Sequence, residues 1–406
     1  MKIKLGVLFG GKSVEHEVSI ISALQACNSL SREKYEIIPI YMTKKNEFYV
    51  GPEIGNIESY RHGIPALLQK SQQVLMIPAN GQVQLLRYPL KKLGNNLVNT
   101  LDIIFPIVHG TNVEDGALQG YLKTLGIPFV GCDVLASALG MDKYMMKCVW
   151  KDAGLPVLSC LRADHKHYLE NPDAFLDKVE AEIGYPVIVK PIDLGSSVGI
   201  RKALDRNELS DAMDYAFQFA HKVLVERAVP HLKEINCSIL GDYESAEASE
   251  CEEPVSSDRI LTYEEKYLPK DGGKTGGAKG GGAGSASEGM ASLSRIIPAN
   301  ITDEERAFVR ETAVKAFQAL DCCGVSRIDF MMDSETREIW INEINTIPGS
   351  LSFYLWEPLG VSYTELLDRM IALALKRDRD QAEISYAFDT NILAGVKLGG
   401  TKGSKL

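Results

Sequence analysis

The chain has 406 residues, of which 45% are hydrophobic and 24% charged, so it is long enough for two or three globular domains. Its formal net charge of -10 argues against a general basic surface for nucleic acid. The longest apolar runs, such as residues 103–108, are far shorter than the roughly 20 residues that span a bilayer, so we expect no membrane segment.

Cysteine spacing favours a reducing compartment. The 8 cysteines include no CxxC pair, so a cytoplasmic protein is expected. The last three residues, Ser404-Lys405-Leu406, match a peroxisomal address signal. Because the tail is rich in Gly and Lys and can end this way by chance, we do not expect that targeting.

Strand-like and helical segments alternate over the first 130 residues. This alternation predicts a mostly parallel sheet covered by helices. The expected elements are a strand at 3–9, a helix at 17–30, strands at 36–42 and 101–108, and a helix at 118–125.

Residues 6–13 match the P-loop pattern GxxxxGK[ST], but we reject a P-loop. Residues 7–9 are the apolar end of the first strand, which leaves only residues 10–13 as a turn. That turn opens the first helix and presents Glu15 near its N-terminus. There Glu15 either complements the helix dipole or has a functional role.

The next part of the chain is expected to be a smaller α+β unit, with a helix at 141–153, strands at 186–191 and 223–226, and a helix at about 206–220. Lys190 ends a strand before the small residues 195–199, whose backbone amides can approach a phosphate. Glu226 closes another strand, where its carboxylate can face an adenine amino group. Taken alone, Lys143, His165 and His167 are expected to be surface side chains.

The C-terminal part is richer in β-structure. Alternating apolar residues at 235–239 predict a strand, and a capping box of Thr302 and Glu305 predicts the start of a helix. Between them, residues 271–290 are dominated by Gly and are either a linker or a mobile lid.

The strongest constellation lies in two strands near the C-terminus. Alternation puts Arg327 and Asp329 on one face of the first strand, and Glu343 and Asn345 on one face of the second. Asp329 and Glu343 are equally far from Thr336, which lies in a predicted turn at 333–337, so they should face each other. Facing carboxylates with an amide suit Mg²⁺ or Mn²⁺. The alternative is a solvated strand face, which the flanking hydrophobic residues disfavour.

Together these segments resemble an ATP-grasp ligase and, more closely, the D-alanine:D-alanine ligase family, over about residues 3–375. The resemblance rests on these blocks, in chain order: Gly10-Gly11-x-Ser13-x-Glu15-x-Glu17-Val18-Ser19, His109-Gly110, Glu114-Asp115-Gly116, Gln119-Gly120, Ser137-Ala138-Leu139, Met141-Asp142-Lys143, Val189-Lys190-Pro191, Gly195-Ser196-Ser197-Val198-Gly199, Glu265-Lys266-Tyr267, Arg327-Ile328-Asp329, Glu343-x-Asn345-Thr346 and Pro348-Gly349.

This resemblance implies an α/β and α+β multi-domain fold, in which a Rossmann-like N-terminal domain precedes a two-part ATP-grasp fold. The implied domains are the Rossmann-like domain at 1–131, a central ATP-grasp subdomain at 132–226, a C-terminal ATP-grasp subdomain at 227–388 with a lid near 262–295, and a flexible tail at 389–406.

The implied activity is ATP-dependent ligation of two D-alanines through an acyl phosphate, for peptidoglycan synthesis, by a cytoplasmic homodimer without nucleic acid or membrane partners. The implied cofactors are ATP and two Mg²⁺ ions, with Mn²⁺ as a substitute.

The implied nucleotide contacts are Lys143, Lys190, Ser197 and Lys266 at the phosphates, Glu226, Ala228 and Val229 at adenine, and Glu234 at the ribose. The implied metal ligands are Asp329, Glu343 and Asn345. The implied substrate and catalytic contacts are Glu15, Ser196 and Tyr267 at the donor ammonium, His109 near the donor, and Arg327 with the Gly349 N–H at the oxyanion.

One departure from the family concerns the second substrate. The family places a Ser after Pro-Gly to bind the acceptor carboxylate, and Tyr354 occupies that place here. The acceptor therefore stays open between D-alanine, D-serine, D-lactate and another small acid. A non-catalytic ATP-binding regulator is the rival reading, but Arg327 and the metal carboxylates are present.

Overall fold

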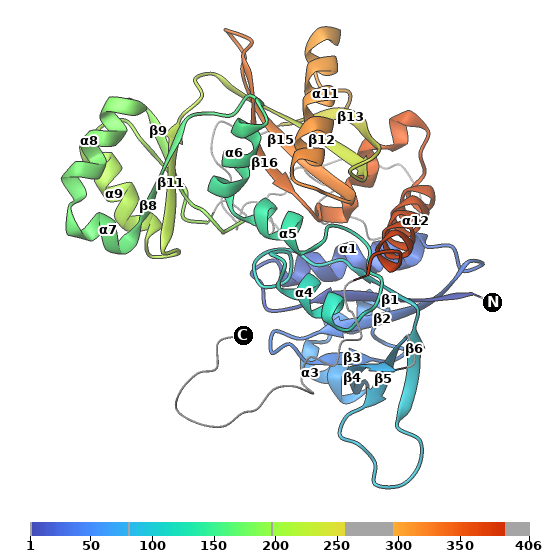
Figure 1. The fold of residues 1–406 in the computed structure, drawn as a ribbon. Coiled ribbons are helices and arrows are strands. Elements are labelled where there is room, and N and C mark those ends of the chain that lie inside the picture. The colour runs from blue at the N-terminus through green and yellow to red at the C-terminus, as the bar shows by residue number, and fades with distance from the viewer. Residues whose placement is uncertain (1, 80–81, 196–197, 256–294, 386–406) are drawn as a thin grey trace, which may run out of the picture.

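The computed structural model describes residues 2–79, 82–195, 198–255 and 295–385, and three β-sheets organise them (Figure 1). The N-terminal sheet lies at the bottom of the view, the middle sheet at the left, and the C-terminal sheet at the top. The predicted α/β and α+β multi-domain fold is confirmed. Within the described ranges, no helix is long and apolar enough to cross a membrane.

The N-terminal sheet has seven strands in the order β6-β5-β4-β3-β2-β1-β7. They are β1 (Ile3–Gly10), β2 (Tyr35–Met42), β3 (Phe48–Val50), β4 (Gln72–Ala79), β5 (Gln82–Arg87), β6 (Leu97–Leu101) and β7 (Ile103–Pro106). The prediction of a mostly parallel sheet is wrong, because β2 to β6 pair antiparallel and only the pairs of β1 with β2 and β7 are parallel in this described sheet. Connections as short as that between β4 and β5 can join only antiparallel neighbours.

The predicted turn after β1 is present and opens the first helix. Gly10 and Gly11 have φ of 97° and 93°, and a Cβ on Gly10 would come 2.2 Å from the Met42 carbonyl oxygen, so only glycine fits there. Residues 7–9 lie inside β1 and are buried, which confirms that they are not part of a phosphate loop. The helices of this part are α1 (His16–Ser29), α2 (Ile57–Arg61), α3 (Ile64–Gln69) and α4 (Ala117–Thr124).

The middle sheet has four antiparallel strands in the order β10-β9-β11-β8. They are β8 (Cys160–Asp164), β9 (Val187–Pro191), β10 (Arg201–Ala203) and β11 (Lys222–Arg227), and the helices α7 (His165–Glu170), α8 (Pro172–Glu182) and α9 (Arg206–Ala216) lie on one side (Figure 1). Val189 and Val225 belong to the core on the helix side. Because neighbouring side chains alternate, Lys190 and Glu226 point to the opposite face.

The C-terminal sheet has five antiparallel strands in the order β14-β13-β12-β15-β16. They are β12 (Leu232–Gly241), β13 (Ala246–Pro254), β14 (Arg295–Ile296), β15 (Gly324–Asp333) and β16 (Ile339–Asn345), and the associated helices are α5 (Val134–Met141), α6 (Lys143–Asp152) and α11 (Asp303–Ala319). Trp150 of α6 and Phe317 of α11 are fully buried in one core with the sheet. The predicted capping box is confirmed, since Thr302 Oγ1 accepts from the Glu305 N–H at 3.3 Å.

The last elements of the described chain return to the N-terminal sheet. They are the 3₁₀ segments η2 (Gly349–Leu355) and η3 (Glu357–Leu359) and the helix α12 (Tyr363–Ala382). Leu366 and Met370 of α12 lie in the same buried cluster as Leu24 of α1. The Thr364 hydroxyl also donates to the Ser29 carbonyl at 2.7 Å. The segment after β16 is therefore held against the N-terminal part of the molecule.

We predict that Phe317→Ala lowers the free energy of unfolding by about 3–5 kcal/mol, because it leaves a cavity in the core of the C-terminal sheet. Phe308 lies on the same helix but is 43% exposed, so Phe308→Ala is the matched control, with an expected loss below about 1 kcal/mol. Urea denaturation measures both. Equal losses would show that α11 does not bury its face as described.

Candidate active site

The hairpin of β15 and β16 carries the two carboxylates that were predicted to bind metal, Asp329 and Glu343. Asp333 ends β15, and its Oδ1 accepts from the backbone N–H groups of Glu335 at 2.9 Å and Thr336 at 3.2 Å, which turns the chain. The resulting register pairs Asp329 with Glu343. The prediction that these two carboxylates face each other is therefore confirmed.

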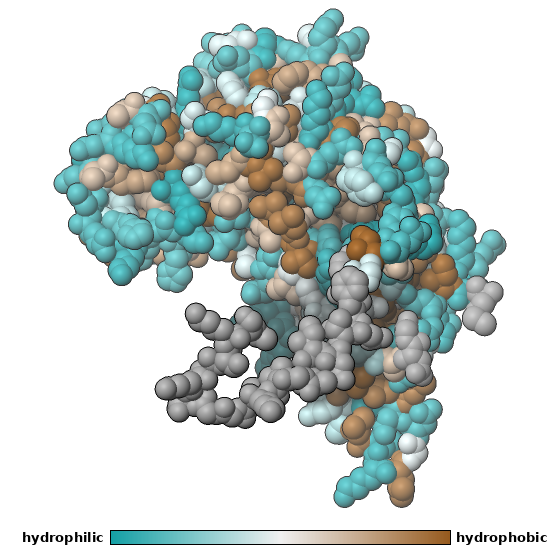
Figure 2. All heavy atoms as spheres, viewed as in Figure 1, coloured by the Kyte–Doolittle hydropathy of each residue, from teal (hydrophilic) through white to brown (hydrophobic). Residues whose placement is uncertain are grey.

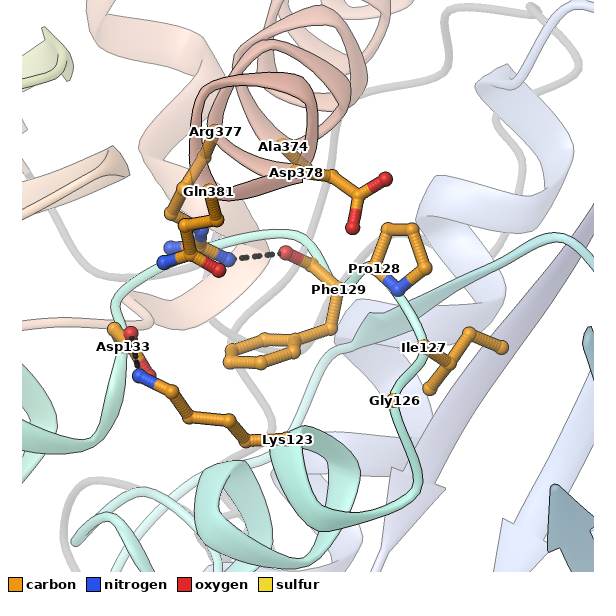
Figure 3. Close-up of a pocket in the computed structure, with 10 residues that line it drawn as sticks. All are labelled: Lys123, Gly126, Ile127, Pro128, Phe129, Asp133, Ala374, Arg377, Asp378 and Gln381. Atoms are coloured by element: carbon orange, nitrogen blue, oxygen red, sulfur yellow. Dashed lines mark hydrogen bonds and ion pairs between the residues drawn. The ribbon is translucent and has the colours of Figure 1, made fainter. Parts of the chain in front are cut away.

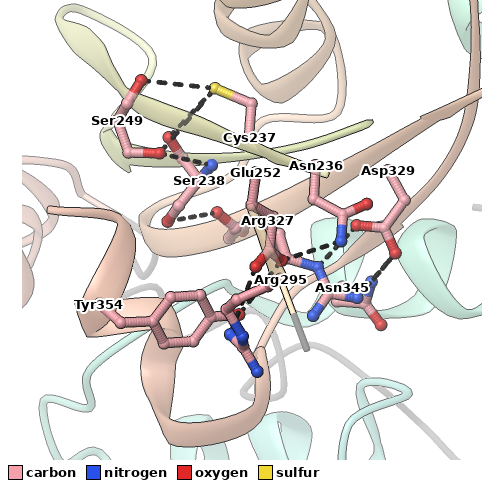
Figure 4. Close-up of polar contacts among 11 residues, drawn as sticks. Asn236, Cys237, Ser238, Ser249, Glu252, Arg295, Arg327, Asp329, Asn345 and Tyr354 are labelled. Carbon is pink, nitrogen blue, oxygen red and sulfur yellow. Dashed lines mark hydrogen bonds and ion pairs between the residues drawn. The ribbon is translucent and has the colours of Figure 1, made fainter. Parts of the chain in front are cut away.

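Arg327 and Asn345 both bind Asp329 (Figure 4). The Arg327 Nε and Nη2 atoms donate to the two Asp329 oxygens at 2.6 and 2.7 Å, and Asn345 Nδ2 donates to Asp329 Oδ2 at 3.0 Å. Burial raises the pKa of Asp329; Arg327 opposes this rise, and the carboxylates of Glu343 and Glu252 add to it. The local excess of carboxylates over guanidinium charge favours a bound cation.

The chemistry of this cluster suits Mg²⁺. Two carboxylates and an amide supply oxygen ligands, and Mg²⁺ commonly completes its shell with water and phosphate oxygens. In the ranges that the structure describes, no group of three or more His, Cys, Asp or Glu side chains could hold a metal ion by itself. Asp329, Glu343 and Asn345 supply fewer ligands than the octahedral shell of Mg²⁺ holds, so they fit an ion that also binds phosphate oxygens and water.

Two buried lysines lie beside the carboxylates. Lys143 begins α6, and its Nζ donates to the Leu194 carbonyl at 2.8 Å and lies 3.6 Å from Glu343 Oε2. Lys190 of β9 is 4% exposed, and its Nζ donates to Asn342 Oδ1 at 3.1 Å. The expectation that Lys143 is a surface lysine is wrong, because α6 packs against the segment that follows β9. The two ammonium groups approach the hairpin from different elements, as phosphate binding requires.

Glu226 of β11 is buried between two ammonium groups. Its Oε1 lies 2.5 Å from Lys190 Nζ and its Oε2 lies 3.0 Å from Lys147 Nζ. Burial opposes ionisation of Glu226, but the two lysines outweigh it and lower its pKa to about 2. Burial lowers the pKa of Lys147. Lys147 was not predicted from the sequence as a site residue. It lies four residues after Lys143, a spacing that puts both lysines on one face of the helix.

Glu15 lies where loops from two sheets meet. It is the N-cap of α1. A Cβ on Gly110, which has φ of 86°, would come 2.9 Å from Glu15 Oε2, and a Cβ on Gly195 would come 3.4 Å from the same atom. The glycines therefore allow the loops after β7 and β9 to approach the Glu15 carboxylate closely.

His109 binds the segment that follows β16. Its Nδ1–H donates to the Ile347 carbonyl at 2.8 Å, so Nε2 accepts from the Ser22 hydroxyl at 3.0 Å. Burial lowers the pKa of His109, which favours this neutral form. Ser22 Oγ also accepts from the Ser350 N–H at 3.0 Å. His109 thus binds Ile347, just before Gly349, and is linked to Ser350 through Ser22.

Glu114 makes a second link to the same segment. Its Oε1 accepts from the Thr346 hydroxyl at 3.1 Å and the Ile347 N–H at 2.8 Å, and its Oε2 accepts from the Gly110 N–H at 3.0 Å. Burial raises the pKa of Glu114 to about 7. The motif analysis contained Glu114 but assigned it no role.

Gly349 begins η2, whose backbone is strained. Ser350, Leu351 and Ser352 have φ of 51°, 53° and 49°, which non-glycine residues adopt rarely. The links from His109 and Glu114 hold the residues on either side of Gly349, so its N–H is set by contacts with the N-terminal part.

Tyr354 contacts two residues that the sequence analysis missed. Its hydroxyl donates to Glu252 Oε1 at 3.2 Å, and the Arg295 guanidinium carbon lies 4.0 Å from its ring centre. Arg295 Nη1 also donates to Glu252 Oε2 at 3.3 Å (Figure 4). The one sequence signal for this cluster was the group of three acidic residues, Glu250, Glu252 and Glu253, inside a strand.

Several predicted residues lie outside the described ranges or away from the hairpin. Those outside are Ser196, Ser197, Lys266, Tyr267, the Gly-rich segment 271–290 and the tail from 389. Of the predicted adenine and ribose contacts, Ala228 is buried and its N–H donates to the Pro186 carbonyl at 2.9 Å, Val229 is half-buried, and Glu234 is exposed.

A separate pocket of about 110 Å³ lies between α4 and α12 (Figure 3). Three of its charged groups have partners: Lys123 Nζ lies 2.5 Å from Asp133 Oδ2, and Arg377 donates to the carbonyls of Phe129 at 2.5 Å and Gly131 at 2.7 Å. No predicted site residue lines it. We interpret this pocket as a packing defect where α12 joins the N-terminal part.

Comparison with known proteins gives concordant matches along the chain. The family model described as D-ala D-ala ligase N-terminus matches residues 4–132, and the one described as D-ala D-ala ligase C-terminus matches residues 149–277 and 287–372. The chain is 40% identical over 388 residues to a D-alanine–D-alanine ligase of Thermoanaerobacter sp. (strain X514), covering 94% of this chain and 98% of that protein. It is 38% identical over 390 residues to that of Bacillus cytotoxicus, covering 95% and 99%.

Two solved structures share the fold. The D-alanine-D-alanine ligase from Coxiella burnetii has a TM-score of 0.73 at 27% identity, covering 94% of this chain and 96% of that one. The VanG D-Ala:D-Ser ligase from Enterococcus faecalis has a TM-score of 0.73 at 31% identity, covering 92% and 100%.

We predict that Glu226→Gln lowers the free energy of unfolding at pH 7 by about 3 kcal/mol, because it leaves two buried ammonium groups without their carboxylate. The control is Glu182→Gln, which removes an exposed pair with Lys178 and should cost less than about 1 kcal/mol.

Because the pKa of Glu226 is about 2, below its ordinary 4.5, its pairing stabilises the fold fully above pH 4.5 and is lost as the pH falls towards 2. Denaturation from pH 7 to pH 3 should therefore show the difference from wild type shrinking below pH 4.5. A difference that does not depend on pH would contradict the ion pairing.

Proposed function

The chain belongs to the D-alanine:D-alanine ligase family, and on that premise we propose that it joins two D-alanines with ATP to form D-alanyl-D-alanine for peptidoglycan synthesis. The single observation that supports this best is the hairpin in which Arg327, Asp329 and Glu343 meet the buried amine of Lys143. The Arg327 guanidinium is thus fixed beside the Asp329 and Glu343 carboxylates, and the Lys143 ammonium group, which is proposed to bind phosphate, lies near Glu343. The proposed domains are 1–131, 132–226 and 227–388, with a lid near 262–295.

The proposed reaction has two steps. The carboxylate of the first D-alanine attacks the γ-phosphorus of ATP, which forms an acyl phosphate and releases ADP. The amine of the second D-alanine then attacks the acyl carbon and loses a proton, which forms the peptide bond and releases phosphate. Catalysis in such a reaction depends on positioning and on neutralising the charge of the phosphoryl oxygens.

For nucleotide binding we propose that Lys143 and Lys190 hold the phosphates, since both ammonium groups are buried and lie near the hairpin. Glu226 would accept from the adenine amino group while its two lysines keep it ionised. The remaining proposed contacts are Ser197 and Lys266 at the phosphates, Ala228 and Val229 at adenine, and Glu234 at the ribose.

For the metal we propose that Asp329, Glu343 and Asn345 hold two Mg²⁺ ions, which Mn²⁺ can replace. When bound, these ions would neutralise negative charge on the phosphoryl oxygens. The facing register of Asp329 and Glu343 and the burial that raises the pKa of Asp329 support this assignment.

For the donor we propose that Glu15 binds the ammonium group of the first D-alanine, with Ser196 and Tyr267 beside it and His109 close to that pocket. The close approach of Gly110 and Gly195 to the Glu15 carboxylate supports a small, enclosed substrate there. Glu15 and His109 follow different strands, β1 and β7, so they would approach the donor from two sides and select it by its shape and charge.

For the oxyanion of the second step we propose donation by Arg327 and by the Gly349 N–H. The two short hydrogen bonds from Arg327 to Asp329 hold its guanidinium in one orientation before substrate binds. Preorganised donors of this kind stabilise the charge that develops in the transition state.

A different acceptor is the second candidate function. The likeness to the VanG D-Ala:D-Ser ligase, which joins D-serine by its name, favours D-serine over D-lactate as that alternative. Tyr354 at the place of the family's serine also supports a second site that differs from the usual one. Under either acceptor the first substrate is D-alanine.

We also propose that the enzyme is a cytoplasmic homodimer. Hydrophobic residues reach the surface in the N-terminal part of the molecule, at the bottom of Figure 2. Leu75, Ile77 and Leu97 on the outer face of the N-terminal sheet are 39%, 37% and 39% exposed, an apolar face that a second copy could cover. Multi-angle light scattering would report twice the chain mass for a dimer.

The activity is tested with the purified chain, ATP, Mg²⁺ and D-alanine. We expect phosphate release equal to the amount of D-alanyl-D-alanine found by mass spectrometry, and loss of both when EDTA removes the metal. A panel of D-serine and D-lactate, each mixed with D-alanine, measures the acceptor by product mass. Phosphate release without any dipeptide or mixed product would contradict the proposed ligase activity.

We predict that Asp329→Asn and Glu343→Gln each abolish measurable turnover, because each removes a charge that the Mg²⁺ site requires. Circular dichroism should show that both variants remain folded. Glu338→Gln is the control, since Glu338 is an exposed residue at the end of the same hairpin. Near-normal turnover by either site variant at millimolar Mg²⁺ would overturn the metal assignment.

A further inference from the structure

Glu252 lies at the centre of a cluster of polar side chains at one end of the candidate active site (Figure 4). It is 3% exposed. Its Oε1 accepts from Asn236 Nδ2 at 2.9 Å and from the Tyr354 hydroxyl at 3.2 Å, and its Oε2 accepts from Arg295 Nη1 at 3.3 Å. Nothing in the reaction described above uses Glu252 or Arg295.

The sheet places this cluster in line with the proposed metal ligands. Glu252 of β13 pairs with Asn236 of β12, Asn236 pairs with Asp329 of β15, and Asp329 pairs with Glu343 of β16. Directly paired residues point to the same face of a sheet. The four side chains therefore form one row across four neighbouring strands.

The two ends of this row differ in chemistry. At the Glu343 end, the ammonium group of Lys143 lies 3.6 Å from the carboxylate, as suits a phosphate. Arg327 and Asp329 lie in the middle, where the proposed oxyanion forms. At the Glu252 end lies a second guanidinium, that of Arg295. In the second step, the amine of the second amino acid attacks at the middle of the row, from the side away from the phosphate. The carboxylate of that amino acid then lies at the Arg295 end of the row.

Arg295 is held in a geometry that suits a carboxylate. Its guanidinium carbon lies 4.0 Å from the centre of the Tyr354 ring, and this stacking orients the plane of the guanidinium. Its contact with Glu252, at 3.3 Å, is longer than the 2.7–2.9 Å or so of a strong charge-assisted hydrogen bond. A guanidinium carries five N–H donors, so it can bind Glu252 and a second carboxylate together.

We propose that Arg295 binds the carboxylate of the second amino acid, and that Tyr354 and Glu252 are positioning residues that orient its guanidinium. This inference rests on the proposed ligase function and adds to it the residue that recognises the acceptor. In this proposal Arg295 binds the acceptor carboxylate instead of the family's serine, whose place Tyr354 occupies. The acceptor is therefore a small amino or hydroxy acid with a free, ionised carboxylate.

The first test compares Arg295→Met with wild type in steady-state ligation of D-alanine, scored by dipeptide mass and phosphate release. The apparent KM for the second D-alanine should rise about ten- to a hundredfold, because a charge-assisted pair is lost. The KM values for ATP and for the first D-alanine should stay within about twofold of wild type, since Arg295 is proposed to bind only the acceptor.

Arg306→Met is the matched control for this test. Arg306 lies on α11, forms an ion pair with Glu250 on the same strand as Glu252, and donates to the Ala299 carbonyl at 3.1 Å. Its loss removes a guanidinium that binds the same strand, β13, without removing a contact of Tyr354 or Glu252. Its acceptor KM should match wild type. If Arg306→Met raises that KM as much as Arg295→Met does, the effect is structural and the inference is wrong.

The second test removes the charge from the substrate. D-Alaninamide is a D-alanine without an ionised carboxylate. The KM of wild type for D-alaninamide as acceptor should therefore exceed its KM for D-alanine. The increase should equal that which Arg295→Met causes with D-alanine as acceptor. Arg295→Met should then add no further penalty with D-alaninamide. An equal penalty on both acceptors, or none on either, would overturn the inference.

Two variants of Tyr354 test whether this residue orients Arg295 or binds the acceptor itself. Tyr354→Phe keeps the ring under Arg295 and loses the bond to Glu252, so the acceptor KM should rise only about twofold. Tyr354→Ala removes the ring and should approach the effect of Arg295→Met, with kcat changed much less than KM. If Tyr354→Ala leaves the acceptor KM unchanged, the positioning role is wrong.

The outcomes distinguish the inference from the function it rests on. If wild type forms no D-alanyl product at all, the proposed function fails, and the role of Arg295 fails with it. If wild type forms the product and Arg295→Met keeps a normal acceptor KM, only the inference fails.

Discussion

Buried charge pairs between the middle sheet and helix α6 fix how the elements around the candidate active site are arranged. Glu226, at 2% exposure, cannot stay ionised inside the protein without Lys147 and Lys190. One of these lysines comes from α6 and the other from β9, so the pair holds the middle sheet at a fixed place against α6. Lys143 on the same helix can then reach Glu343 on the C-terminal sheet. Charge pairing thus brings together the elements that would surround a nucleotide.

A second set of buried polar contacts brings the N-terminal part to the same place. His109 and Glu114 both bind the backbone of Ile347, and Ser22 connects His109 with Ser350. These contacts surround Gly349 and hold a run of left-handed residues that would otherwise relax. The proposed donor pocket and the proposed oxyanion donor are therefore assembled by residues from opposite ends of the chain.

The row of side chains across the C-terminal sheet explains how one surface could serve two chemical steps. Glu343 and Asp329 concentrate negative charge where a cation and phosphate fit, while Arg327 supplies a fixed positive group beside them. Asn236 and Glu252 continue the row to Arg295. Antiparallel pairing keeps these side chains about one strand spacing apart, so the order of groups along the row sets the order of substrate groups.

Short-range rules and the quoted motifs were enough to predict part of this protein from its residues. Equal spacing from Thr336 predicted that Asp329 faces Glu343, and a capping box predicted where α11 begins. Three features could be found only in the folded molecule: the antiparallel part of the N-terminal sheet, the burial of Lys147 with Glu226, and the stacking of Arg295 on Tyr354. The reason is that local patterns report on neighbours a few residues apart. These contacts join segments distant in sequence, and burial energies summed over the whole fold select them.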